Sequence, residues 1–250
     1  MSGHSKWHSI RHKKARVDAA KGKIFTRLIK ELTIAARLGG ADPDMNPRLR
    51  VAMQAAKAAN MPAKNIENAI KKGTGELPGV VYEEVIYEGY GPGGVALYII
   101  AMTDNKNRTV AEIRHLLNKY GGNLGESGCV AWMFEKKGLI KVARDKFDEE
   151  ELLMVVIDVG ADDMQSDDNE YYEIYTDHDQ LEKVREALEQ NNIVISSAAR
   201  TMIPQSTVQL DGKHAEQMLK LLEMLDDHDD VQDFYANFDI DDEVITKIAG

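Results

Sequence analysis

The spacing of apolar residues changes at a short linker, Gly73–Gly79, and this change constrains the fold more than any other feature of the sequence. Before the linker, apolar residues recur every three or four positions from Ile24 to Ala36, a pattern typical of an amphipathic helix that ends at Gly39-Gly40. Asn46-Pro47 predicts the start of a second helix, because Asn is a favoured N-cap and Pro a favoured first residue. A third helix is predicted from Asn60-Met-Pro62 to Gly73.

After the linker the sequence carries strand patterns. Val80–Tyr87 and Val95–Met102 are rich in β-branched and aromatic residues and predict a hairpin. Thr103-Asp104 can cap a helix that runs to about Tyr120, and Cys129–Phe134 reads as the next strand. The following segments predict a β-α-β-β-α-β order, which is the ferredoxin-like motif: strand 138–142, helix 148–159, strands 163–166 and 171–176, helix 180–190 and strand 194–198.

The chain closes with a predicted strand at 207–210, a helix at 213–225 and a strand at 231–236. We expect these elements to complete the sheet that begins at residue 80. The predicted fold class is α+β: an N-terminal helical domain is followed by two α/β domains, the last ferredoxin-like and inserted into the middle one. The predicted boundaries are 1–76 for the helical domain, 80–136 plus 205–240 for the discontinuous middle domain, and 137–204 for the insertion.

Charge is segregated along the chain. Residues 1–73 hold sixteen Lys or Arg and five Asp or Glu, a net charge of +11, whereas the other 177 residues carry −22. Lysines and arginines that neutralise phosphates release counterions, so this basic segment predicts a polyanionic partner, usually nucleic acid or an anionic membrane. The alternative is a solvated tail whose like charges repel one another.

Composition narrows the class of protein. No apolar run approaches the roughly 18 residues that a membrane span requires. The N-terminus lacks the apolar segment of a secretion signal, although its basic first 30 residues leave a transit peptide as an alternative. The single Cys129 permits no internal disulfide and reads as a packed strand residue rather than a nucleophile. We therefore expect a cytoplasmic protein that does not bind membranes.

Two motifs suggest ligands that their surroundings disfavour. Gly89–Gly94 matches the dinucleotide fingerprint G-x-G-x-x-G, but a strand follows it instead of the required helix, so we expect a tight hairpin with positive φ angles. His4, His8 and His12 would share one helix face, but nearby Lys and Arg would repel a metal ion. Imidazoles interleaved with Trp7 suit bases and phosphates better. The sequence predicts no metal site and no cofactor.

The sequence also predicts no catalytic site, because no residue has the local signature of an activated nucleophile. The acidic stretches, such as Asp148–Glu151 and Asp226–Asp230, read as solvated faces, or alternatively as docking sites for basic ribosomal or polymerase surfaces. Lys106 and Arg108 stand at a predicted helix start, where positive charge is disfavoured, and are either binding residues or harmless exposed ones. The glycine-rich loop Gly121–Gly125 either cradles a ligand or simply joins helix to strand.

Several linked motifs follow one another along nearly the whole chain: Gly3-His-Ser-Lys-Trp7, Arg11-His-Lys-Lys14, Lys21-Gly-Lys-Ile-Phe25, Gly39-Gly-Ala-Asp-Pro43 with Asn46-Pro-Arg-Leu-Arg50, Tyr87-Glu-Gly-Tyr-Gly-Pro-Gly-Gly94, Asp104-Asn-Lys-Asn-Arg-Thr109 and Gly121-Gly-Asn-Leu-Gly125. In this order they resemble the YebC/PmpR family of probable transcriptional regulators. Gly128-Cys-Val130 departs from the more usual Gly-Ser-Val of that family, which puts little beyond a core contact in doubt.

The resemblance implies three domains, DNA binding, control of transcription and a bacterial cytoplasmic setting. The family also includes mitochondrial translational activators, so the alternative is an RNA- or ribosome-binding factor that regulates translation with the same surface. The oligomeric state stays open. The candidate nucleic-acid-binding residues are Lys6, Trp7, Arg11, His12, Lys13, Lys14, Arg16, Lys21, Lys23, Arg48, Arg50, Lys106 and Arg108.

Overall fold

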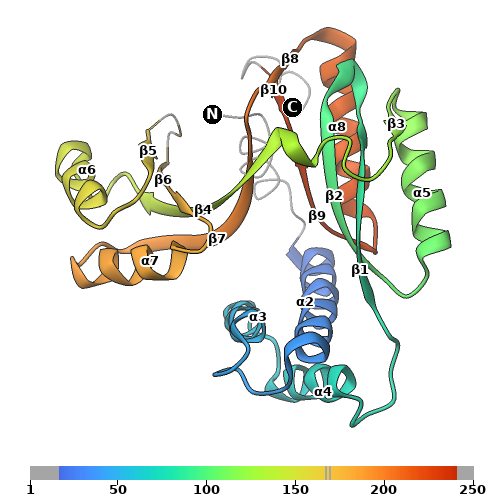
Figure 1. Ribbon diagram of the computed structural model, residues 1–250, viewed down its shortest axis with the longest axis horizontal. Coiled ribbons are helices and arrows are strands. Elements are labelled where there is room, and N and C mark those ends of the chain that lie inside the picture. Colours follow the sequence, from blue (N-terminus) through green and yellow to red (C-terminus); the bar gives the residue numbers. More distant parts are fainter. Residues whose placement is uncertain (1–16, 167, 169, 241–250) are drawn as a thin grey trace.

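The computed structural model describes residues 17–166, 168 and 170–240, with side chains from residue 22 onward. Among the described residues, the N-terminal part consists of three helices and is called the head: α2 (Val17–Gly39), α3 (Pro47–Ala58) and α4 (Ala63–Thr74). Residues 83–240 form two four-stranded sheets, a two-stranded parallel pair and the helices that accompany them, and we call this part the body (Figure 1). The prediction of an α+β fold with a helical N-terminus is confirmed.

The head is held by a small apolar core and by one asparagine. Leu32, Leu49 and Ala56 are fully buried where α2 and α3 meet. As predicted, Asn46 caps α3 and Pro47 begins it: the Asn46 side chain accepts from the Leu49 amide at 3.0 Å. The Asn46 amide group also donates to the carbonyl of Ala35 in α2 at 2.8 Å. One side chain therefore both starts α3 and fixes it against α2.

The prediction that α4 ends at Gly73 is wrong, because the helix continues to Thr74 and is capped by Gly75 at φ 84°. Gly73 has a different purpose. A Cβ at this position would lie 2.3 Å from the Thr33 carbonyl oxygen, so its absence allows α4 to cross close to α2.

The first sheet of the body has the strand order β3-β1-β2-β9. Strands β1 (Glu83–Tyr90) and β2 (Ala96–Thr103) form the predicted hairpin, β3 (Asn123–Leu124) borders β1, and β9 (Val231–Ala236) pairs antiparallel with β2. Helices α5 (Lys106–Lys119) and α8 (Gly212–Asp227) pack on this sheet and share its core. Strands β8 (Val208–Leu210) and β10 (Phe238–Ile240) form a separate parallel pair. Of the C-terminal strands expected to complete the sheet that begins after the linker, β9 joins it as predicted, whereas β8 pairs with β10 outside it.

The second sheet has the order β5-β6-β4-β7, and every neighbouring pair is antiparallel. Its elements follow one another as β-α-β-β-α-β, and this order with this pairing confirms the ferredoxin-like insertion. The chain enters and leaves it side by side, since the Gln205 amide donates to the Met133 carbonyl at 2.9 Å. The elements are β4 (Phe134–Ala143), α6 (Glu149–Asp158), β5 (Asp163–Gln165), β6 (Tyr171–Asp177), α7 (Leu181–Gln190) and β7 (Ile195–Pro204).

One expectation about the loops is wrong and another is confirmed. Cys129–Phe134 is not a strand: the chain turns, forms the 3₁₀ helix η2 (Ala131–Met133), and begins β4 at Phe134. The hairpin between β1 and β2 turns through the 3₁₀ helix η1 (Pro92–Gly94), and the expected positive φ angles occur at Gly93 and Gly94. Gly91 has a φ of −91°, which any residue could adopt.

Candidate nucleic-acid interface

More than half of the candidate residues precede the described side chains. Lys6, Trp7, Arg11, His12, Lys13, Lys14 and Arg16 lie outside the described residues, as do His4 and His8. Lys21 lies in α2, but its side chain is outside the described part. Five candidates remain whose side chains can be placed: Lys23, Arg48, Arg50, Lys106 and Arg108.

The basic face of α2 binds the body of the same chain. Lys23, Arg27 and Lys30 recur at spacings of four and three, so they share one helix face. Lys23 Nζ lies 2.8 Å from Asp227 and Arg27 Nη2 lies 3.0 Å from Asp226, both at the end of α8. The expectation that Asp226–Asp230 is a solvated face or a docking site for another molecule is therefore wrong, because it overlooks these internal partners.

Lys30 is the centre of this contact. Its side chain is only 7% exposed, and its ammonium group donates to the Met102 carbonyl (3.0 Å), the Asp229 carbonyl (2.9 Å) and Asp230 Oδ1 (2.9 Å). An ammonium group has three hydrogens, and these three acceptors satisfy all of them. Lys30 is thus a structural residue that joins head to body.

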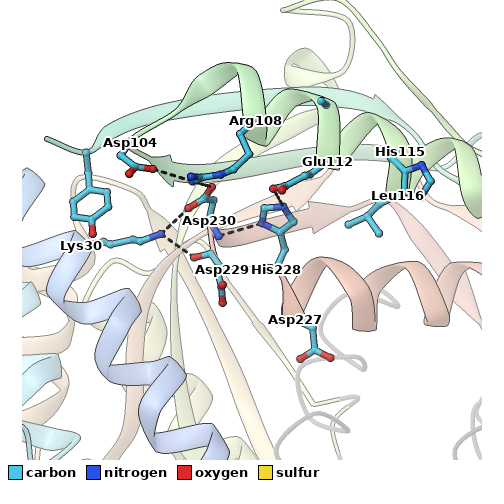
Figure 2. A pocket seen from close by; sticks show the side chains of 12 residues that line it. Lys30, Asp104, Arg108, Glu112, His115, Leu116, Asp227, His228, Asp229 and Asp230 are labelled. Carbon is cyan, nitrogen blue, oxygen red and sulfur yellow. Dashed lines mark hydrogen bonds and ion pairs between the residues drawn. The ribbon is translucent and has the colours of Figure 1, made fainter. Parts of the chain in front are cut away.

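Asp230 joins the same lysine to α5. Its Oδ2 accepts from Arg108 Nη2 at 2.7 Å and from the Thr109 hydroxyl at 2.8 Å, while Oδ1 accepts from Lys30 (Figure 2). Burial of this carboxylate opposes ionisation, but the hydrogen bonds from Arg108, Lys30 and Thr109 outweigh it and lower the pKa of Asp230 below its ordinary value. The carboxylate therefore stays ionised between two cations.

Arg108 occupies a position where the helix dipole disfavours positive charge, and its two carboxylate partners explain why it is tolerated. Asn105, rather than Thr103 or Asp104, is the N-cap of α5 and accepts from the Arg108 amide at 3.1 Å. The Arg108 guanidinium pairs with Asp104 as well as with Asp230, and these hydrogen bonds raise its pKa above the ordinary value.

A cavity of about 900 Å³ opens beside this network, between α2, α5 and the connection from α8 to β9 (Figure 2). His228 lines it. Its Nδ1 accepts from the Asp230 amide at 3.1 Å, so the ring proton belongs on Nε2, which lies 3.0 Å from Glu112.

Glu112, His228 and Asp230 place ligand-type atoms within 4.8 Å of one another. They fit a metal ion poorly, because both Asp230 oxygens already accept hydrogen bonds and two of the donors are cationic side chains. The cluster is an internal ion-pair and hydrogen-bond network that orients the head on the body.

Two further candidates form ion pairs. Arg48 on α3 donates to both oxygens of Glu31 at 2.7 and 3.0 Å and also pairs with Glu84 of β1. These hydrogen bonds raise its pKa. Lys106 Nζ lies 2.5 Å from Glu83. In each pair the carboxylate reduces the positive field that a phosphate would experience at that site.

Arg50 is the described candidate that differs. It is exposed on α3, and its guanidinium donates a 3.4 Å hydrogen bond to the Pro43 carbonyl and forms no ion pair with the described residues. Lys57 of α3 and Lys64 of α4 are exposed as well and form no ion pair with the described residues. These three cations, which include two that the sequence analysis did not select, lie on the same two helices of the head.

The segment between β3 and β4, which follows the glycine-rich loop Gly121–Gly125, encloses a carboxylate of its own chain. Glu88, a buried residue of β1, accepts from the amides of Gly128 (2.6 Å), Val130 (2.8 Å) and Ala131 (2.8 Å). Convergent backbone amides of this kind also bind anions. Because the Glu88 carboxylate already occupies the site formed by these amides, they serve to shape the loop. Amides that donate to Glu88 are not available for hydrogen bonds to a neighbouring strand, so this segment does not form the predicted strand. Burial raises the pKa of the neighbouring Cys129 thiol, which is consistent with a packing residue.

The other glycine motif is enclosed by the protein itself. A Cβ on Gly91 would lie 3.0 Å from Met218 Sδ and 3.1 Å from Leu97, and a Cβ on Gly93 would lie 2.5 Å from Leu210. Strand β2, not a helix, follows η1, so the helix N-terminus that holds a pyrophosphate in the dinucleotide fold is missing from this loop.

Together these features define the class: an α+β protein with a basic helical head bound to an α/β body that carries a ferredoxin-like insertion. Residues 5–76 match the model of the TACO1/YebC protein N-terminal domain, and residues 82–238 match that of the TACO1/YebC second and third domain. The chain therefore belongs to the TACO1/YebC family, as the resemblance of its motifs predicted.

Several bacterial proteins are similar to this chain. A probable transcriptional regulatory protein of Sulfurihydrogenibium sp. is 58% identical over 251 residues, covering 100% of both chains. One from Geobacter sulfurreducens is 59% identical over 248 residues, covering 99% of this chain and 100% of that one. The crystal structure of a conserved hypothetical protein from Aquifex aeolicus is 53% identical and has a TM-score of 0.83 over 93% of this chain and 96% of that one. Among the described residues, no helix combines the length and apolar character needed to cross a membrane.

Proposed function

We propose that this protein is a non-enzymatic, cytoplasmic regulator of transcription that binds DNA through the basic N-terminal segment. The observation that carries the proposal is the segregation of charge, with +11 on residues 1–73 and −22 on the rest. Relatives named probable transcriptional regulatory proteins support a regulatory role. The carboxylates of the body would repel a phosphate backbone and so favour binding at the head.

The internal ion pairs direct the proposal to particular residues. Lys23, Arg48, Lys106 and Arg108 each pair with a carboxylate, so they contribute less to phosphate binding than their number suggests. The binding surface then consists of the lysines and arginines that precede α2 together with exposed head residues such as Arg50. Contacts of these side chains with the phosphate backbone give affinity for any DNA sequence, and contacts with the bases add specificity.

The test uses the full-length protein with Lys13→Glu and Lys14→Glu combined. Loss of two phosphate contacts and addition of two repulsive charges should weaken binding to duplex DNA by about tenfold or more. The slope of the logarithm of the binding constant against the logarithm of the salt concentration should become shallower by about two. The matched control, Lys136→Glu with Lys183→Glu, makes the same charge change on exposed lysines of the body and should bind almost as well as the wild type. Fluorescence anisotropy over a salt series measures both effects.

Equal losses in the two variants would contradict the proposal, because general charge rather than the head would then govern binding. Single-stranded RNA provides the second arm. Tighter binding to RNA than to duplex DNA at matched salt, lost in the Lys13/Lys14 variant, would replace DNA with the RNA or ribosome alternative.

A further inference from the structure

Helices α6 and α7 of the insertion cover the same face of the β5-β6-β4-β7 sheet, and each contains ten residues (Figure 1). Their inner faces are alike. Leu152 and Val156 of α6, and Val184 and Leu188 of α7, are buried in one shared core. The two helices therefore occupy equivalent places in the insertion, so a difference between their outer faces does not follow from their place in the fold.

Their outer faces differ. The residues that α7 exposes are charged or polar, among them Glu182, Lys183 and Glu186, as expected for a helix with one solvated face. Helix α6 instead exposes Leu153, Met154 and Ile157, whose exposed fractions are 40%, 62% and 66%. Positions 153, 154 and 157 lie at spacings of one, three and four, so their side chains form one contiguous strip.

A helix that is apolar on both faces is usually buried on both faces. Scattered exposed apolar residues are ordinary in proteins, but a contiguous strip on one helix points to a contact surface. The outer face of α6 thus has the composition of an interface, while that of α7 does not.

Charge limits what can bind there. Helix α6 starts with the N-cap Asp148 and three consecutive glutamates, and it ends with Asp158. Glu150, Glu151 and Asp158 are exposed and form no ion pair with the described residues. Such a rim repels nucleic acid and anionic lipid, and a second copy would bring two acidic rims together.

We propose that the outer face of α6 binds a basic amphipathic helix of a partner protein. Leu153, Met154 and Ile157 would contact the apolar face of that helix, and the acidic residues at both ends of α6 would pair with its lysines or arginines. This surface is separate from the nucleic-acid-binding segment proposed above. The protein would then attach to nucleic acid with its basic head and to a protein with its acidic insertion.

The experiment uses the full-length protein and two fluorescein-labelled synthetic peptides. Each is a helix of about 18 residues with leucines on one face, and the other face carries lysines in one peptide and glutamates in the other. Fluorescence anisotropy should show saturable binding of the lysine peptide only. Met154→Ser with Ile157→Ser should weaken that binding by about tenfold or more, because the removed contacts are central to the strip.

The matched control is Lys183→Ser with Glu186→Ser on the outer face of α7, which should leave the affinity within about twofold of the wild type. Neither double variant should lower the melting temperature appreciably, since all four side chains are exposed. No binding of the lysine peptide, equal binding of both peptides, or unchanged affinity in the α6 variant would each overturn the proposal. Self-association of the wild type that the α6 variant abolishes, measured by sedimentation, would also overturn it and assign the strip to a second copy.

Discussion

Within the molecule, the first sheet of the body meets the head on one side and the insertion on the other, through junctions of opposite chemistry. The head is joined to the first sheet by ion pairs between side chains. Lys30 and Asp230 are both nearly buried, with side chains 7% and 6% exposed, and Arg108 completes the network. The insertion is joined to it by apolar side chains, with Phe134 and Met202 of β4 and β7 packed against residues of the first sheet such as Tyr98 and Tyr235.

This difference has consequences for specificity and for stability. An apolar junction gains free energy from area removed from water and tolerates small shifts. A buried ion pair contributes little net energy, but it strongly penalises any arrangement in which one partner lacks the other. The ionic junction therefore fixes the position of the head, whereas the apolar junction mainly supplies cohesion.

The largest effect that we predict is at the ionic junction. Asp230→Ala leaves Lys30 and Arg108 without their shared carboxylate and should destabilise the protein by about 3–5 kcal/mol. Urea unfolding at neutral pH measures this loss. Asp227→Ala is the control, because this more exposed carboxylate pairs with Lys23 in water and should cost about 0–1 kcal/mol. Equal losses in the two variants would show that the junction is no more than a set of surface pairs.

The apolar junction should respond somewhat less and without dependence on salt. Phe134→Ala removes a ring that is 6% exposed and should cost about 3 kcal/mol, at the low end for buried phenylalanine because the site lies at a junction. Unfolding in 0.05 and 0.5 M salt should give the same difference from the wild type. A salt-dependent loss would indicate that charges also hold the insertion in place.

The order of elements was predictable from the sequence because it depends on local patterns. The β-α-β-β-α-β series, the Asn46-Pro47 helix start and the strand at 231–236 follow from residue spacing, caps and β-branched runs within short windows. One local prediction that was wrong involved a distant partner. Cys129–Phe134 has the composition of a strand. The carboxylate of Glu88, about forty residues earlier, accepts hydrogen bonds from two backbone amides of this segment, and the chain bends there.

The candidate site was less predictable for the same reason. Lys23, Arg27 and Lys30 look like a nucleic-acid-binding face, and their carboxylate partners lie about two hundred residues later. Nothing in the local sequence distinguishes an exposed lysine from one whose acid arrives from another element. The sequence shows the net charges of residues 1–73 and of the rest of the chain correctly. It does not show that some of these basic and acidic side chains pair with each other in the folded protein.

The smallest effect that we predict is a difference in the pH dependence of stability, which the ionic junction should have and the apolar junction should lack. Because the pKa of Asp230 is lowered in the folded protein, its stabilising contribution should be complete above the unfolded value of about 4 and should be lost as the pH falls toward the folded value. Urea unfolding between pH 7 and pH 3 should show a smaller loss of stability in Asp230→Asn than in the wild type. Phe134→Ala should retain the full pH dependence, since no titrating group is removed. Identical pH profiles for the wild type and Asp230→Asn would mean that this carboxylate does not supply the acid sensitivity of the head junction.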